Sequence, residues 1–269
     1  MGTTDVSGNQ TRGRSRDVLF RALSNSDRRA IIDIVRDRSP DGIEKAELAA
    51  RFATVTADEP DGAASGDERD QARIALEHRH LPQLLDAGLL VETNSGAIET
   101  ADHWAFEDSS VIDAITDRSA EVQSELDVLF GALADNRRRA MLSVLEPRAG
   151  ERSVETLARD VAAYESSPSE SVEPSDVERV EASLVHVHLP MLAHAGVIDF
   201  DVDANRISYA DHPVLRREWL GADATTASTN AGDDRSSDRT GFDGSSRPSR
   251  PDDWRARIAS TVAQLASSR

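Results

Sequence analysis

Apolar residues in the first third of the chain recur every three or four positions, the spacing of helices that bury one face. A short leading helix is predicted near residues 18–23, followed by capping residues at 24–27 and a first long helix. A second helix is predicted over 43–52 and a third over 71–87. Between these two lies a stretch rich in Pro, Ser, Gly and acidic residues, about 54–67, which predicts a loop.

Gly88 directly follows the third helix and precedes two short apolar runs. A glycine just beyond the last turn supplies the left-handed cap that ends many helices. Residues 89–91 and 97–98 then flank the turn residues Asn94, Ser95 and Gly96, which is the pattern of a β-hairpin. The segment therefore predicts helices followed by a two-stranded hairpin.

The same order of segments returns in the second half of the chain. Asp17–Phe20 recurs as Asp127–Phe130, and each copy is followed by Ala-Leu and then by Arg-Arg-Ala. His78–Leu84 recurs as His186–Leu192, with the phrase His-x-His-Leu-Pro-x-Leu in both. We call the two copies repeat one and repeat two. The unit is roughly ninety residues long, which is enough for a small independent core and too long for a solenoid repeat.

Repeat two predicts the same elements as repeat one. Its predicted helices cover residues 128–133, 141–145, 154–162 and 177–195, with a loop at about 164–175 and a hairpin at 197–209. Asp135 is the expected helix cap, and Gly196 stands where Gly88 does. We therefore expect two copies of one domain.

The segments outside the repeats complete the predicted organisation. Residues 109–126 predict a helix that links the repeats or builds their interface, and residues 252–269 predict a short amphipathic helix that docks on this chain or on a partner. Both are candidates for self-association. The predicted boundaries are a disordered tail at 1–15, domains at 16–108 and 127–221, and a disordered linker at 222–251.

A resemblance to known proteins sharpens the fold. The phrase Leu-Pro-x-Leu-x-x-Ala-Gly, at Leu81–Gly88 and Leu189–Gly196, resembles the junction of the third helix and the first wing strand in many prokaryotic regulators. Together with the Arg-Arg-Ala helix, it resembles a haloarchaeal domain family of unknown function with winged-helix character, found singly and in tandem. The resemblance implies an α+β, mainly α fold of two tandem winged helix-turn-helix domains. It implies little about activity.

Composition places the chain in a particular environment. Its formal net charge is −18, with 49 acidic against 31 basic residues, and Lys45 is its one lysine. Such a carboxylate surface is typical of halophilic proteins, because molar salt screens repulsion within about 3 Å. The absence of cysteine excludes disulfides and thiolate chemistry. Without an apolar run of membrane-spanning length or a signal peptide, we expect a cytoplasmic protein that does not enter membranes.

The second helix of a helix-turn-helix motif, here the third helix of each repeat, enters the major groove, so its outward residues are candidates for reading double-stranded DNA. Arginines at the start of the first long helix are further candidates, because positive charge there opposes the helix dipole and suggests contact with phosphate. The candidate DNA-binding residues are Arg28, Arg29, Arg69, Arg73, Arg79 and Gln83 in repeat one, and Arg137, Arg138, Arg139 and Arg179 in repeat two. Repeat one is expected to read bases better than repeat two.

Two observations oppose this assignment. The arginines at the helix starts can instead pair with nearby aspartates or lie over the interface between the repeats. The acidic loop before each third helix would repel phosphate, and the chain lacks the basic balance of a DNA-binding domain. In molar salt, however, counterion release is a weak driving force, so base contacts must carry more of the affinity.

Paired histidines are the remaining candidate chemistry. The repeated motif comprises His78, His80, Pro82 and Gly88 in repeat one, and His186, His188, Pro190 and Gly196 in repeat two. Histidines two residues apart on a helix point about 200° from each other, so they cannot share a metal ion. Each proline removes a helical hydrogen bond, so we expect the motif to be structural, at a kink or a helix start, and we expect no metal.

No motif indicates an enzyme. The chain lacks a phosphate-binding glycine loop, a nucleophile elbow and a His-Glu-x-x-His helix, and we expect no cofactor. The favoured hypothesis is a sequence-specific transcriptional regulator of a halophilic archaeon, in which the two repeats form a pseudo-dimer on DNA. The alternative hypothesis is a protein-interaction or scaffold module that keeps the winged fold without contacting DNA.

Overall fold

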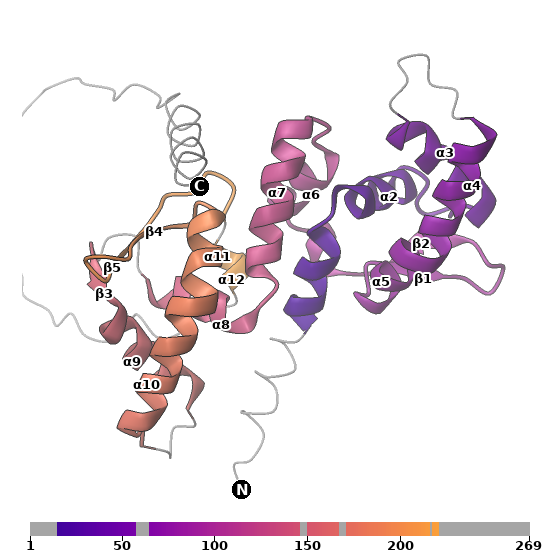
Figure 1. Ribbon diagram of the computed structural model, residues 1–269. Coiled ribbons are helices and arrows are strands. Elements are labelled where there is room, and N and C mark those ends of the chain that lie inside the picture. The colour runs from indigo at the N-terminus through magenta and orange to yellow at the C-terminus, as the bar shows by residue number, and fades with distance from the viewer. Residues whose placement is uncertain (1–14, 58–64, 146–149, 167–170, 216, 221–269) are drawn as a thin grey trace, which may run out of the picture. The chain divides into compact units, whose positions relative to one another are not determined.

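The computed structural model describes residues 15–57, 65–145, 150–166, 171–215 and 217–220, and these form mainly helices with two small antiparallel sheets (Figure 1). Residues 1–14 of the predicted tail, the predicted linker and the predicted C-terminal helix lie outside the described residues. Within the described part of the chain, no helix is long and apolar enough to cross a membrane. The fold is thus α+β and mainly α.

Repeat one begins with a helix at residues 15–23, which leads into α2 (Ser26–Arg36). The side chain of Asn25 separates the two helices by accepting a hydrogen bond from the backbone N–H of Arg28. The remaining helices of repeat one are α3 (Lys45–Thr56), α4 (Gly66–Ala75), a π-helical turn (Leu76–His80) and α5 (Leu81–Asp86). The last three run on without a break and form the third helix.

Repeat two follows the same plan. Asp135 takes the place of Asn25 and accepts from the backbone N–H of Arg138. The helices are α7 (Ala120–Leu133), α8 (Asn136–Val144), α9 (Val154–Glu165), α10 (Pro174–Ser183), a π-helical turn (Leu184–His188), α11 (Leu189–His194) and the short α12 (Arg217–Leu220). The third helix of this repeat is α10–α11.

The third helices begin earlier than the sequence predicted. Helix α4 starts at Gly66 because Ser65 and Glu68 form a capping box, in which each side chain accepts from the backbone N–H of the other residue. Helix α10 starts at Pro174, and proline is favoured in a first helical turn. The second helices also run further, to Thr56 and Glu165. The predicted loops are therefore shorter than expected, and residues 58–64 and 167–170 within them lie outside the described residues.

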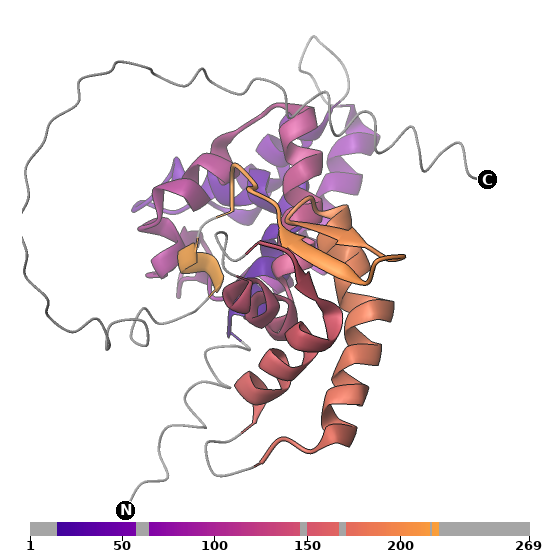
Figure 2. The same cartoon turned by 90° about the vertical axis from the view of Figure 1, so that its left-hand side faces the viewer.

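Each repeat contains more β structure than the predicted hairpin. In repeat one β1 (Leu90–Glu92) pairs with β2 (Ile98–Thr100), and Ile43 bridges to Ile98. In repeat two β4 (Ile198–Asp201) pairs with β5 (Arg206–Tyr209), and β3 (Arg152–Ser153) adds to β5 in the order β3-β5-β4. Figure 2 shows the β4–β5 hairpin beside the third helix of its repeat. The additional strand is too short to have a periodicity that could be read from sequence.

The predicted linking helix at 109–126 is two helices. Helix α6 (Ser109–Thr116) ends where the Asp117 side chain accepts hydrogen bonds from the backbone and hydroxyl of Ser119. This local turn competes with the helix. Helix α7 then begins at Ala120 and continues into the predicted leading helix of repeat two. The boundary predicted at 126/127 therefore falls inside one helix.

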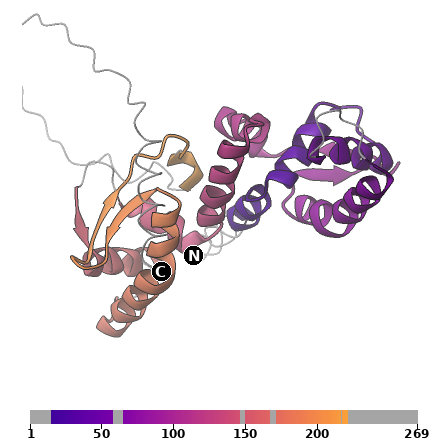
Figure 3. The same ribbon diagram turned by 45° about the horizontal axis from the view of Figure 1, so that its top comes forward.

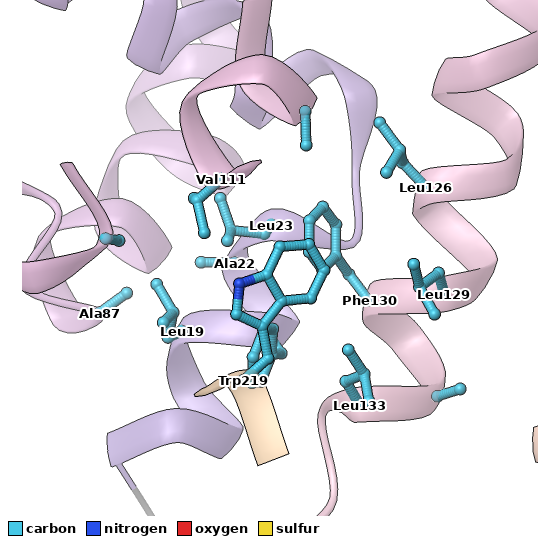
Figure 4. Close-up of a cluster of buried hydrophobic side chains, with 14 of the residues drawn as sticks. Leu19, Ala22, Leu23, Ala87, Val111, Leu126, Leu129, Phe130, Leu133 and Trp219 are labelled. Carbon is cyan, nitrogen blue, oxygen red and sulfur yellow. The ribbon is translucent and has the colours of Figure 1, made fainter. Parts of the chain in front are cut away.

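The two repeats share one hydrophobic core. The leading helix of repeat one lies beside α7 (Figure 3), and Phe20 stacks on Phe130 with ring centroids 6.0 Å apart. Trp219 lies 6.3 and 5.6 Å from these two rings and donates from Nε1 to Asp108. Figure 4 shows its indole among leucines from both repeats. Because this side chain is fully buried, it fixes the end of repeat two onto both leading helices.

Candidate nucleic-acid interface

The third helix of repeat one has a buried side and an outward side. Its buried side chains are Ala72, Leu76, His80, Leu81 and Leu84. Beside them, Arg69, Arg73, Arg79 and Gln83 are all exposed, as expected for residues that read bases. Arg73 lies 3.8 Å from Asp70, at the limit of an ion pair, whereas neither Arg69 nor Arg79 pairs with a carboxylate among the described residues. Within the part of the chain that the structure describes, Arg69 and Arg79 therefore present unpaired guanidinium groups to solvent.

A π-helical turn shapes the middle of this surface in both repeats. The backbone N–H of Leu81 donates to the carbonyl of Leu76, and that of Leu189 donates to Leu184. The next residue is proline, which has no N–H for the carbonyl four residues earlier. Because a π-helical turn is wider than an α-helical turn, both His80 and Leu81 can point into the core. Arg79, just before them, remains outside.

The repeated histidines divide into an inner and an outer member. His78 and His186 are exposed, whereas His80 and His188 are buried 3.8 and 3.7 Å from the carboxylates of Asp27 and Asp135. Burial lowers the pKa of each inner histidine, although the nearby carboxylate opposes this shift. Among the described residues, no three His, Asp or Glu side chains gather as metal ligands would.

The glycine caps also have a structural partner. Gly88 and Gly196 have φ values of +68° and +67°, the left-handed conformation of a helix C-cap. A Cβ built at these positions would come within 4.0 and 3.8 Å of the rings of His103 and His212. These histidines belong to the Ala-Asp-His phrase shared by both repeats. The shared glycines and histidines therefore pack together in each copy.

Four of the arginines predicted to contact phosphate are inside the protein. Arg28 and Arg138 donate to the carbonyls of Ala22 and Ala132, at equivalent places in the two repeats. The other two, Arg29 and Arg139, have relative exposures of 0% and 1%. Buried side chains cannot reach a phosphate, so we remove Arg28, Arg29, Arg138 and Arg139 from the candidate DNA face.

Arg29 and Arg139 instead connect the repeats in a reciprocal way. Arg29 donates to Asp127 of repeat two at 2.6 Å, and Arg139 pairs with Asp17 of repeat one at 2.7 Å. Asp17 and Asp127 open the repeated Asp-Val-Leu-Phe phrase, so the two pairs are equivalent. Burial lowers the pKa of Arg29, and its hydrogen bond to Asp127 opposes that shift.

The same arginines lie over the stacked phenylalanines. Arg29 is 5.9 Å from the ring centre of Phe130, and Arg139 is 5.8 Å from that of Phe20. Each arginine also donates to a carbonyl of its own repeat, at Leu23 or Leu133. Each contact is thus made twice, once in each direction between the repeats. Such an interface has local twofold symmetry.

The last candidates, Arg137 and Arg179, have carboxylate partners on the protein. The Nε and Nη2 atoms of Arg137 donate to the two carboxylate oxygens of Glu165, each at 2.6 Å, and this bonding raises the pKa of Arg137. Arg179 is exposed and pairs with Asp176, one turn away on the same helix. Repeat two therefore offers no unpaired arginine among the described candidates.

The outward side of the third helix in repeat two carries different residue types. The positions of Arg79 and Gln83 are taken by Val187 and Met191, which are 50% and 43% exposed. The positions of Arg69 and Arg73 are taken by Val177, which packs against the hydrophobic core, and by the half-buried Glu181. Val187 and Met191 were not predicted as site residues, although an alignment of the two His-x-His-Leu-Pro phrases matches them with Arg79 and Gln83.

Comparison with known proteins agrees with the duplication. A family model described as a domain of unknown function (DUF7344) matches residues 20–98 and again residues 130–208. The two matches together cover more than half of the chain. No curated protein and no solved structure matches it.

Proposed function

The chain belongs to the DUF7344 family in two tandem copies, and since that family carries no assigned activity, we propose from the site itself that the protein is a DNA-binding transcriptional regulator. The observation that carries the proposal is the outward side of the third helix of repeat one. It holds Arg69, Arg73, Arg79 and Gln83, all exposed. In this proposal each repeat is a winged helix-turn-helix domain.

The order of elements supports the winged-helix assignment. In repeat one, α2 is followed by Ile43, which forms a bridge to the hairpin, and then by α3, the third helix and the hairpin itself. In repeat two the strand β3 takes the place of Ile43. In helix-turn-helix domains the second helix of the motif lies in the major groove, and here that helix is α4–α5. The hairpin that follows then corresponds to the wing.

The exposed side chains have the chemistry that base reading needs. Arginine can donate two hydrogen bonds to the O6 and N7 atoms of guanine, and glutamine can pair with the N6 and N7 atoms of adenine. Arg79 is one turn from Gln83 along the helix, so the two can address neighbouring base pairs. In this proposal Arg69 and Arg73, nearer the helix start, contact the DNA backbone or a further base.

The acidic surface is compatible with this function in a salt-rich cytoplasm, which is part of the proposal. Phosphate contacts lose affinity steeply as salt rises, because they depend on counterion release. A protein that binds DNA in molar salt therefore needs base contacts more than a broad basic surface. A few exposed arginines on one helix, within a chain of net charge −18, fit that requirement.

The test is crosslinking and recovery of bound DNA from cells, with the protein kept in molar potassium chloride. We expect a discrete sequence motif, and we expect Arg73→Glu with Arg79→Glu to abolish its recovery. Both positions are exposed, so the variant should keep the thermal unfolding midpoint of the wild type. Unchanged recovery by the folded double variant would show that this helix is not the reading surface.

One observation favours a second candidate, a protein-interaction module. Val187 and Met191 form an exposed apolar pair one turn apart on repeat two, and exposed apolar groups are common at protein interfaces. The same crosslinked sample, analysed for protein, distinguishes the candidates. A specific protein partner without any DNA above background would replace the DNA proposal.

A further inference from the structure

The two third helices occupy equivalent places in a locally twofold arrangement. The reciprocal pairs Arg29–Asp127 and Arg139–Asp17 relate one repeat to the other, and Phe20 stacks on its counterpart Phe130. When both subunits of a twofold DNA-binding dimer read bases, the target is palindromic. A palindromic target would therefore be the first expectation for this chain.

The backbones of the two helices give no reason to expect different roles. Both contain a π-helical turn, both have proline at the second position after it, and both end at a glycine with positive φ. His80 and His188 are buried at the same place. Any difference in what the helices bind must therefore come from their outward side chains.

Those side chains differ at all four positions proposed to read DNA in repeat one. Arg69, Arg73, Arg79 and Gln83 of repeat one correspond to Val177, Glu181, Val187 and Met191 of repeat two. Valine and methionine have no hydrogen-bond donor for a base edge, and a glutamate repels phosphate. Glu178 is exposed beside them, and the neighbouring Arg179 is paired with Asp176. The side chains of repeat two are therefore poorly suited to reading bases, although its backbone is equivalent to that of repeat one.

A second chain cannot restore the symmetry through the same surface. The residues that would form the twofold contact are already used within one chain, since Phe20, Phe130, Arg29 and Arg139 are buried against each other. The internal repeat has taken the place of a partner subunit.

We infer that the protein reads a single, non-palindromic half-site of duplex DNA through repeat one, and that repeat two serves as the internal partner that holds repeat one in place without reading bases. The inference rests on the proposed function. It names the class of target, which is an asymmetric site contacted in one major groove.

The test is selection of binding sites from random duplex DNA with the full chain in molar potassium chloride, followed by affinity measurements on the selected site. We expect one contiguous motif without an inverted repeat. Arg79→Glu should weaken binding by at least about tenfold. The matched variant Val187→Glu should change affinity by less than about twofold, because that position faces no DNA. Both substitutions are at exposed sites, and equal urea unfolding curves would verify that both variants fold.

Each alternative result has its own meaning. Selection of an inverted repeat, or an equal loss of affinity in Arg79→Glu and Val187→Glu, would overturn the inference while leaving DNA binding established. Failure to select any sequence would overturn the proposed function, and the inference with it.

Discussion

The two repeats have the same interior and different outer surfaces. Both bury an arginine that reaches the other repeat, both bury the second histidine of the motif, and both end the third helix at a left-handed glycine. On the outward side of that helix, the position of Arg79 in repeat one is occupied by Val187 in repeat two. Packing constrains the residues inside each copy, while exposed positions are free to differ.

The comparison assigns different roles to residues that look alike in the sequence. Arg29 and Arg79 are both arginines on helices of repeat one, yet Arg29 is fully buried and Arg79 is exposed. The buried arginine recurs in repeat two as Arg139, and the exposed one does not recur. For these arginines, recurrence between the copies accompanies a buried structural contact, and loss of recurrence marks a surface position that can carry function.

The largest effect is expected where the repeats hold each other. Arg29→Met should lower the free energy of unfolding by about 2–3 kcal/mol, because removing the buried guanidinium leaves the carbonyl of Leu23 and the partly exposed carboxylate of Asp127 without their donor. Arg139→Met should cost a similar amount if the contact is truly reciprocal. Urea unfolding in molar potassium chloride measures both.

The exposed Arg79→Met is the control for losing an arginine, and we expect it to change stability by less than about 0.5 kcal/mol. A loss for Arg139→Met that is much smaller than the loss for Arg29→Met would show that the two halves of the interface are not equivalent. A loss near zero for both would contradict the structural role assigned to the pair.

A smaller effect should follow substitution of the glycine caps. Gly88→Ala and Gly196→Ala should each lower the free energy of unfolding by about 1–2 kcal/mol, the cost of placing a side chain in the left-handed region. The added methyl group meets only ordinary contacts with His103 or His212, so the backbone carries the cost. Gly66, which has no positive φ and open space around its Cβ direction, is the control, and Gly66→Ala should not destabilise. Equal losses at all three glycines would refute the assignment.

Much of the fold and part of the candidate site could be predicted from the sequence. Helical spacing, the glycine stops and the repeated phrases predicted the duplicated helices and hairpins, and the family match to both copies confirms the duplication. The exposed positions of Arg69, Arg73, Arg79 and Gln83 followed from the same periodicity. These features depend on local pattern, which a sequence displays directly.

Long-range pairing could not be predicted in the same way. An arginine at a helix start looks the same whether its partner is a phosphate or an aspartate from another repeat, so Arg29 and Arg139 were assigned to DNA as one of two alternatives. Their partners, Asp127 and Asp17, stand at equivalent positions in the repeated phrase, and this was an available sign of reciprocity. Strand β3 and the docking of Trp219 depend on contacts between distant segments.

The smallest effect concerns pH and tests whether the two interiors match. His80 and His188 have pKa values lowered mainly by burial, so in the unfolded chain each binds a proton at a higher pH than in the folded protein. Stability rises with pH wherever the unfolded state binds more protons. The contribution of these histidines is therefore complete above about pH 6.5, the ordinary value, and is lost as the pH falls below it.

Replacing each inner histidine by methionine should make the free energy of unfolding less dependent on pH between about 7 and 5, and by similar amounts in the two repeats. His103 and His212 have pKa values lowered by burial as well, so part of the dependence should remain in the double variant. A pH dependence that changes in His80→Met but not in His188→Met would mean that the interiors of the two repeats differ in solution. The two repeats would then differ in their cores as well as in their outer surfaces, contrary to the structure.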